Sequence, residues 1–394
     1  MVDSLKIAES DLLTILNYWS FWDKRPPRFI KREVNLPKPL ANIALVVQGV
    51  RRCGKSTLLI QYLSHFGIPP RNATFVNFED PKLSDVLNYK LLDAIVEIGH
   101  KRKIEGKEHY FFLDEIQHVE GWERWLHSRL ERPKSDHFII TGSNSSLLSG
   151  ELSTVLTGRH ITIELFPFSF KEISENQPRL TVDNYLKNGG FPQPVLENLG
   201  ERLLKEYFDD ILERDVRKRI HGRSIKDLRS TIKIVYEACG SELSSRKIAG
   251  TLGISTDTVS SYLDASEKAY LICRCPYFAY SEKQQTARQK KYYAIDTGLR
   301  RAVITKSGQD RGKDFENMVY LHLRRKYKEI YYWKGKGEVD FVAIDNDGVV
   351  PIQVSYDSMK DRHLTALDEF YFTFPQSKEA VLINSDNVKE FLKS

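Results

Sequence analysis

The chain has 394 residues, 41% of them hydrophobic, and a formal net charge of +6 at pH 7. This length suggests two or three domains, and this apolar content is typical of a globular chain, which excludes an intrinsically disordered one. No apolar run reaches the roughly 20 residues that span a bilayer, the N-terminus lacks a signal-peptide pattern, and the four cysteines form no disulfide framework. We therefore expect a cytoplasmic protein without a membrane segment.

The first two regions of the sequence differ in their residue patterns. Residues 1–28 contain an amphipathic aromatic stretch that is broken by Pro26 and Pro27, and we interpret them as an N-terminal arm packed on the next domain. In residues 29–175, short apolar segments that end in polar residues alternate with helical segments. Buried parallel strands joined by helices have this pattern, so the region is predicted to be an α/β core.

A phosphate-binding loop follows the first apolar strand and opens a helix: Gly49-x-x-x-x-Gly54-Lys55-Ser56. The glycines let backbone N–H groups face a phosphate, and the helix N-terminus adds positive potential. We expect Lys55 to reach the β- and γ-phosphates and Ser56 to hold Mg²⁺. The predicted cofactors are therefore ATP and Mg²⁺. The predicted nucleotide-binding residues are Gly49, Val50, Arg51, Arg52, Cys53, Gly54, Lys55, Ser56, Thr57 and Asp114.

An acidic pair, Asp114 and Glu115, follows a second apolar strand. Asp114 is placed to share the Mg²⁺ shell with Ser56, so these two are the predicted metal ligands, and Glu115 is placed to polarise the attacking water. The pair could instead only cap the next helix. An acid next to the metal ligand favours ATP hydrolysis over a GTPase scheme, in which a glutamine often positions the water.

Two more polar positions complete the predicted catalytic set. Asn144 follows a third apolar strand and could sense the γ-phosphate or orient the water. Arg159 could be an arginine finger, supplied in cis or to a neighbouring subunit of a homo-oligomer, or a surface ion-pair partner. The predicted catalytic residues are Lys55, Glu115, Asn144 and Arg159.

The middle of the chain is basic. Residues 176–225 are predicted to be a helical lid, and residues 226–285 contain a helix-turn-helix in which Gly253 allows the turn. Residues 201–300 hold 19 lysines and arginines against 14 aspartates and glutamates, so any nucleic-acid contact should centre there. The second helix begins with Thr256-Asp257-Thr258 instead of basic or amide side chains, so we expect contacts to the nucleic-acid backbone and little base reading. A winged helix used only for packing is the alternative.

The last region, residues 286–394, contains two apolar strands around an Asn346-Asp347-Gly348 turn. Metal-dependent nucleases with such a hairpin carry an Asp on one strand and Glu-x-Lys on the next. Asp340 occupies the first position, and Glu316 on the preceding helix fits an auxiliary acid.

The second strand of this hairpin lacks two of the required groups. Gln353 has an oxygen but no negative charge to hold a metal, and Ser355 cannot supply the ammonium that steadies the attacking oxygen. Lys336 or Lys360 could substitute in space. We therefore expect a degenerate nuclease fold without nuclease activity.

Taken in order, these motifs resemble the prokaryotic, archaeal-type AAA-family P-loop ATPases with a C-terminal domain of unknown function. The resemblance covers the chain from about residue 28 and includes GVRRCGKSTLL, FLDEIQHVEGWERWL, ITGSNSSLLSGELSTVLTGR and YYAIDTGLRRA. It implies an AAA-like core, a winged helix and a terminal domain of restriction-endonuclease-like (PD-(D/E)xK) fold. It also implies that Asn144 matches the first sensor position and Arg159 the Gly-Arg motif.

The sequence thus predicts a Mg²⁺-dependent ATPase coupled to DNA binding or remodelling, with DNA held through residues 201–300. A nucleotide-controlled switch in signalling or defence that binds proteins is the first alternative. An ATP-regulated, metal-dependent nuclease is the second.

Overall fold

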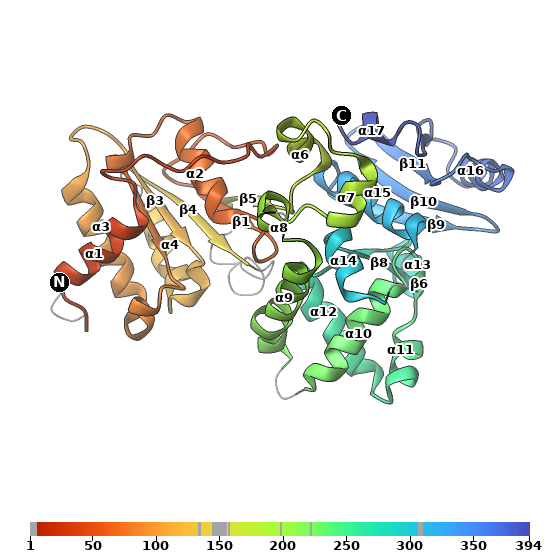
Figure 1. The fold of residues 1–394 in the computed structure, drawn as a ribbon, viewed down its shortest axis with the longest axis horizontal. Coiled ribbons are helices and arrows are strands. Elements are labelled where there is room, and N and C mark those ends of the chain that lie inside the picture. The colour runs from red at the N-terminus through yellow and green to blue at the C-terminus, as the bar shows by residue number, and fades with distance from the viewer. Residues whose placement is uncertain are drawn as a thin grey trace. The chain divides into compact units, whose positions relative to one another are not determined.

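The computed structural model describes residues 6–132, 135–143, 156, 158–197, 199–220, 223–305 and 310–394. The chain divides into two compact units, Met1–Leu165 and Phe166–Ser394 (Figure 1). No helix in the described ranges is long and apolar enough to cross a membrane.

The first unit is built on a five-stranded sheet with the order β2-β3-β4-β1-β5, in which every pair of neighbours is parallel (Figure 1). The strands are β1 Ala44–Gln48, β2 Ala73–Asn77, β3 His109–Asp114, β4 Asp136–Gly142 and β5 His160–Glu164. β4 lies between β1 and β3, so the carboxyl ends of these three strands open on the same edge of the sheet. β1, β3 and β4 are buried along their whole length, which explains their unbroken apolar runs.

Helices cover both faces of this sheet. They are α1 Glu9–Trp19, α2 Lys55–His65, α3 Tyr89–Arg102 and α4 Trp122–Glu131. Apolar side chains of α1, α3 and α4 form one core with alternate strand residues such as Val46 and Phe111. On the opposite face, the Tyr62 ring of α2 meets Phe112 edge-on at 6.2 Å. Helix α1, which lies in the predicted N-terminal arm, contributes Leu12 and Leu16 to the first core.

The second unit is mostly helical. Its helices are α6 Phe170–Asn176, α7 Val182–Asn188, α8 Pro192–Glu197, α9 Gly200–Ile211, α10 Ile225–Glu237, α11 Ser245–Leu252, α12 Thr256–Lys268, α13 Glu282–Ala287, α14 Thr297–Val303, α15 Arg311–Lys326, α16 Asp361–Thr373 and α17 Val388–Phe391. Helix α9 continues through a π-helical turn, Leu212–Val216, into a 3₁₀ turn, Arg217–Arg219.

A three-stranded antiparallel sheet accompanies α10, α11 and α12. Its strands are β6 Glu242–Leu243, β7 Ile272–Cys275 and β8 Lys290–Ala294, in the order β6-β8-β7. Gly253, with φ +67°, ends α11, and Ser255 caps α12 by accepting from the Thr258 N–H at 3.1 Å. The boundary expected between residues 285 and 286 falls inside this sheet. β8, which follows this boundary, pairs with β6 and β7, which precede it.

The last four strands form a sheet with the order β12-β11-β10-β9. They are β9 Glu329–Lys334, β10 Glu338–Asp345, β11 Gly348–Val354 and β12 Val381–Ile383. The predicted hairpin is confirmed, since β10 and β11 are antiparallel and Asp345 pairs with Gly348. Helix α15 packs on both sheets of this unit. Its Tyr320 stacks on Tyr293 of β8 at 4.1 Å and meets Phe341 of β10 at 5.7 Å.

Candidate functional site

The loop between β1 and α2 has a geometry that needs glycine at two positions. A Cβ at Gly49 would lie 2.1 Å from the Leu165 carbonyl oxygen, so only glycine lets the loop approach the end of β5. Gly54, at φ +100°, is the N-cap residue of α2 and provides no side-chain cap. The first N–H groups of α2 are therefore not capped by this residue, and such groups are ready donors to an anion.

Lys55 is buried at the start of α2, with 5% of its surface exposed. Its Nζ donates to the carbonyl oxygens of Gly49 at 3.1 Å and Val50 at 3.3 Å. The same ammonium lies 3.5 Å from Glu115 Oε1. The loop thus wraps around its own lysine, and the acidic neighbour comes from the end of β3.

Asp114 joins four elements at the carboxyl edge of the sheet. Its carboxylate accepts from Ser56 Oγ of α2 at 2.6 Å, from Thr141 Oγ1 of β4 at 2.5 Å and from Asn77 Nδ2 of β2 at 3.1 Å. Burial and the nearby Glu115 raise the pKa of Asp114, although the two hydroxyl donors oppose this. The sequence alone does not point to Asn77 or Thr141. The available signal was that each is a polar residue at the end of a buried strand.

Glu115 has a left-handed backbone, with φ +56° and ψ +46°, which is strained for a residue with a Cβ. Its N–H donates to Thr141 Oγ1 at 3.0 Å, and its Oε2 accepts from Gln117 Nε2 at 2.5 Å and from the Ser143 N–H at 3.2 Å. Burial would raise the pKa of this carboxyl, but Lys55 and Gln117 outweigh burial and lower it. Glu115 is therefore ionised at neutral pH.

Two arginines fix the surroundings of the loop. Arg51 makes a two-pronged contact with Glu79, at 2.8 and 3.1 Å, and Glu79 also lies 3.6 Å from His118 Nε2. His118 and Arg51 hold the pKa of Glu79 well below its usual range. Arg32, which is buried, donates from Nη1 to the Cys53 carbonyl at 2.8 Å. The sequence alone does not point to Glu79, His118 or Arg32.

Two predicted catalytic residues remain, Asn144 and Arg159. Asn144 is outside the described residues. The Arg159 carbonyl accepts from the Ala44 N–H at 2.9 Å, which places Arg159 beside the amino end of β1. The phosphate loop follows the other end of this five-residue strand, about 16 Å away. Arg159 Nη2 lies 3.8 Å from Glu131 Oε1. This placement argues against a contact with the phosphates of its own chain.

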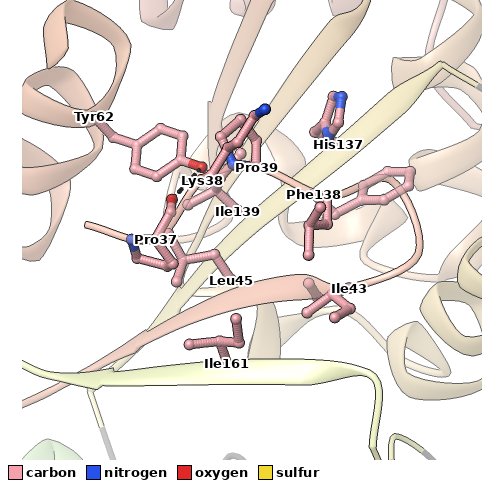
Figure 2. Close-up of a pocket in the computed structure, with 12 residues that line it drawn as sticks. Pro37, Lys38, Pro39, Ile43, Leu45, Tyr62, His137, Phe138, Ile139 and Ile161 are labelled. Atoms are coloured by element: carbon pink, nitrogen blue, oxygen red, sulfur yellow. Dashed lines mark hydrogen bonds between the residues drawn. The ribbon is translucent and has the colours of Figure 1, made fainter. Parts of the chain in front are cut away.

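Figure 2 shows a pocket near the amino end of the same sheet, lined by residues 37–40 together with His137 and Ile161. The Tyr62 hydroxyl donates to the Pro37 carbonyl at 3.2 Å at its rim (Figure 2). The cavity volume is about 10 Å³. A space of this size holds about one water molecule, so the pocket is no substrate site.

In the second unit, Asp340 Oδ2 accepts from Gln353 Nε2 at 2.6 Å and from the Val354 N–H at 2.8 Å. Glu316 Oε1 accepts from the Tyr293 hydroxyl at 2.6 Å. The Ser355 hydroxyl donates instead to the Ser358 carbonyl, at 3.3 Å.

Lys336 and Lys360 are the suggested substitutes for the missing lysine. The Lys336 backbone N–H donates to Glu369, and the Lys360 backbone N–H donates to His363. These bonds do not involve the ammonium of either residue. A different lysine, Lys291 of β8, reaches the acidic cluster, with its Nζ 2.6 Å from Glu338 Oε1 and 3.8 Å from Glu316 Oε1. Within the described ranges, no group of three or more His, Cys, Asp and Glu side chains is arranged to hold a metal ion.

Comparisons with known proteins agree with the fold of the first unit. Residues 41–174 match the family model of an AAA domain, residues 179–310 a domain of unknown function (DUF8612) and residues 311–393 another (DUF4143). An uncharacterized protein of Haemophilus influenzae is 34% identical over 339 residues, which is 81% of this chain and 84% of that protein. The chain belongs to this AAA-domain family.

An uncharacterized archaeal protein, from Methanocaldococcus jannaschii, is also similar to this AAA-domain protein. It is 32% identical over 378 residues, 87% of this chain and 81% of its own. Among solved structures, C. elegans PCH-2 is 14% identical with a TM-score of 0.24, and the match covers 57% of this chain and 60% of that chain. The α/β core with a phosphate loop that the sequence predicts is thus confirmed as an AAA-type domain.

Proposed function

We propose that this AAA-domain protein binds ATP with Mg²⁺ and hydrolyses it in the first unit. The observation that carries the proposal is the convergence of Lys55, Ser56, Asp114 and Glu115 at the carboxyl edge of one parallel sheet. The hydroxyl of Ser56 and the carboxylate of Asp114, 2.6 Å apart, are the hard oxygen ligands that Mg²⁺ prefers.

Each residue has a role in this proposal. Lys55 exchanges its contacts with loop carbonyls for the β- and γ-phosphates, and the N–H groups of the loop and of α2 hold the remaining phosphate oxygens. Ser56 and Asp114 would hold Mg²⁺, which would supply positive charge next to the phosphates. Glu115 accepts a proton from the attacking water, while Thr141 and Asn77 hold Asp114 in place.

The test compares Lys55→Ala with Lys107→Ala, a control at an exposed lysine. Lys55→Ala should lose ATP turnover and most binding of a fluorescent ATP analogue, while the control keeps both. Chelation of Mg²⁺ should stop the wild-type reaction. Wild-type turnover in Lys55→Ala would refute the proposed site.

For assembly, we propose that Arg159 acts in trans, on the nucleotide of a neighbouring copy. The support is its position at the edge of the sheet opposite its own phosphate loop. In that arrangement the ATPase is a homo-oligomer, and a monomer is slow, because an arginine finger contributes about 10³–10⁵-fold to the rate.

We also propose that the second unit couples the ATPase to DNA. Helices α10, α11 and α12 with the sheet order β6-β8-β7 support a winged helix. Thr256 and Asp257 are exposed at the start of α12, and basic side chains such as Lys218 and Lys247 are exposed elsewhere. This distribution favours contacts to the phosphate backbone over base reading.

The DNA test uses the exposed lysines. Arg217 is bonded to Glu213 at 2.7 Å and Arg219 is half-buried, so reversal of either charge would change a contact within the protein as well as the charge. Lys218→Glu with Lys247→Glu should weaken binding equally for all DNA sequences and reduce the salt slope by about 2. If the wild type binds no DNA at low salt and DNA does not stimulate ATP turnover, the protein-binding switch replaces this proposal.

For the C-terminal part, we propose a restriction-endonuclease-like fold that does not cleave DNA. The order α15-β9-β10-β11-α16-β12 and the position of Asp340 opposite Gln353 support the fold. The contacts of Gln353 and Ser355 support the lack of activity, since neither provides the charge that the chemistry needs. Mg²⁺-dependent cleavage of plasmid DNA that Asp340→Ala abolishes would favour the nuclease alternative.

A further inference from the structure

The segment that precedes β1 is attached to helix α2. The Arg32 N–H donates to Gln61 Oε1 at 2.7 Å, and Gln61 Nε2 donates back to the Arg32 carbonyl at 3.1 Å. Both residues are buried, with 4% and 5% of their surfaces exposed. One side-chain amide thus binds both backbone groups of Arg32, as a neighbouring strand would, and fixes the position of its backbone.

From this position, the guanidinium of Arg32 extends to the phosphate loop. Its Nη1 donates to the Cys53 carbonyl at 2.8 Å. In a planar trans peptide, the C=O and the N–H point in opposite directions. Because Arg32 holds the carbonyl of the peptide that joins Cys53 to Gly54, the Gly54 N–H points away from Arg32.

The loop has a conformation that needs such support. Arg52 has φ +68°, in the left-handed region that residues with a Cβ rarely adopt. The Cys53 N–H donates to the Val50 carbonyl at 3.3 Å and closes a turn around Arg52. Turns of this kind direct successive N–H groups to one side and form a concavity that suits an anion. The Arg32 contact comes directly after the turn, where the next N–H group is that of Gly54.

We propose that Arg32 is a positioning residue for nucleotide phosphates, which holds the Gly54 N–H toward them from the far side of the loop and does not touch them. This inference rests on the proposed ATP site and adds to it a residue outside the phosphate-loop motif. Since Arg32 acts on the phosphates, its loss should weaken ATP and inorganic tripolyphosphate equally. By reciprocity, phosphate binding should hold the segment around Arg32 more tightly on α2.

The first test measures the Kd of ATP and of inorganic tripolyphosphate for the full chain by calorimetry. Arg32→Met keeps an unbranched stem and removes the donor, and Lys31→Met, at the exposed neighbour, is the matched control. A hydrogen bond to a charged group contributes roughly 10- to 100-fold to an equilibrium constant. We expect Arg32→Met to raise both Kd values by about tenfold or more, and by the same factor. Arg32→Lys, which keeps a charged donor, should recover part of this loss.

The second test uses the wild type and does not depend on the folding of a variant. Cleavage by trypsin after Lys31 requires the segment to leave α2, because the next residue, Arg32, is buried. Tripolyphosphate at about ten times its Kd should slow this cleavage by up to about tenfold. Cleavage after Lys107, in an exposed loop of the same unit, should keep its rate.

Three results would overturn the inference. They are a folded Arg32→Met variant with wild-type Kd values, a loss of affinity for ATP without a loss for tripolyphosphate, and an unchanged rate of cleavage after Lys31. If Arg32→Met does not fold, the cleavage rate decides. Failure of the proposed function is a separate outcome, in which the wild type binds neither ligand or Lys55→Ala binds both as tightly as the wild type.

Discussion

Replacement of Glu115 by glutamine separates chemistry from binding at the proposed ATPase site. The carboxylate accepts from Gln117 and from the Ser143 N–H and lies 3.5 Å from the Lys55 ammonium. Glutamine has the same shape and retains one oxygen acceptor, but it cannot take a proton from water. A positioned general base contributes about 10²–10⁴-fold to a rate, so kcat of Glu115→Gln should fall by about that factor.

ATP affinity should stay the same or increase in this variant. The glutamine no longer offers Lys55 a negative charge, so the ammonium is more available to the phosphates. The measurements are single-turnover hydrolysis at saturating ATP and Mg²⁺, and a Kd from a fluorescent ATP analogue. Glu120→Gln, at an exposed position on the same loop, is the control.

The pH profile adds a second check on Glu115. Its lowered pKa keeps the base ionised down to a pH below about 4.3, the ordinary value for glutamate. Wild-type kcat should therefore show no loss from Glu115 protonation between pH 7 and pH 5. A Glu115→Gln rate within about threefold of the wild type would refute the base role, and a parallel loss of ATP binding would assign Glu115 a structural role instead.

Three further perturbations test other parts of the molecule. Gly49→Ala would place a Cβ 2.1 Å from the Leu165 carbonyl oxygen, so it should lower the free energy of unfolding by roughly 1–3 kcal/mol in urea titrations, and wild-type stability would contradict the tight approach. A mixture of Arg159→Ala and Glu115→Gln should recover part of the ATP turnover that each lacks alone, whereas no recovery would argue against action in trans. Burial raises the pKa of Asp296 to about 6, so its contribution to stability is present below about pH 3.9 and is lost as pH rises through 6. The free energy of unfolding of wild type relative to Asp296→Asn should thus fall between pH 4 and pH 7, by up to about 3 kcal/mol, and a constant difference would refute the shift.

Local patterns were sufficient to predict much of the fold. The phosphate loop fixes its own context, because its glycines and lysine act only between a strand and a helix. The Asn346-Asp347-Gly348 turn sets the register of its hairpin, so Asp340 and Gln353 could be placed opposite each other before the structure was known. Such predictions succeed where the interacting residues are close in sequence.

The missed residues act over long sequence distances. Asn77 and Thr141 reach Asp114 only because β2 and β4 flank β3 in the sheet, and strand order is not written in any one segment. In the sequence, Lys291 looks like any basic strand residue. Its contacts arise only because β8 packs beside α15 and β10 in the fold. The hairpin pattern therefore pointed to Lys336 and Lys360, which lie nearer along the chain, whereas the lysine that meets Glu338 and Glu316 comes from a separate strand.

The packing of α15 on two sheets also has a consequence for how the second unit unfolds. Tyr320 contacts Tyr293 on one sheet and Phe341 on the other, and Asn317 bonds both backbone groups of Ala294, at 2.8 and 3.1 Å. Loss of either sheet would expose aromatic surface on the helix that supports the other. Amide hydrogen exchange should therefore report one cooperative opening for β8, α15 and β10. We expect that fragments divided at residue 285 would not fold separately. A chimera between two relatives should therefore take β8, α15 and β10 from the same protein.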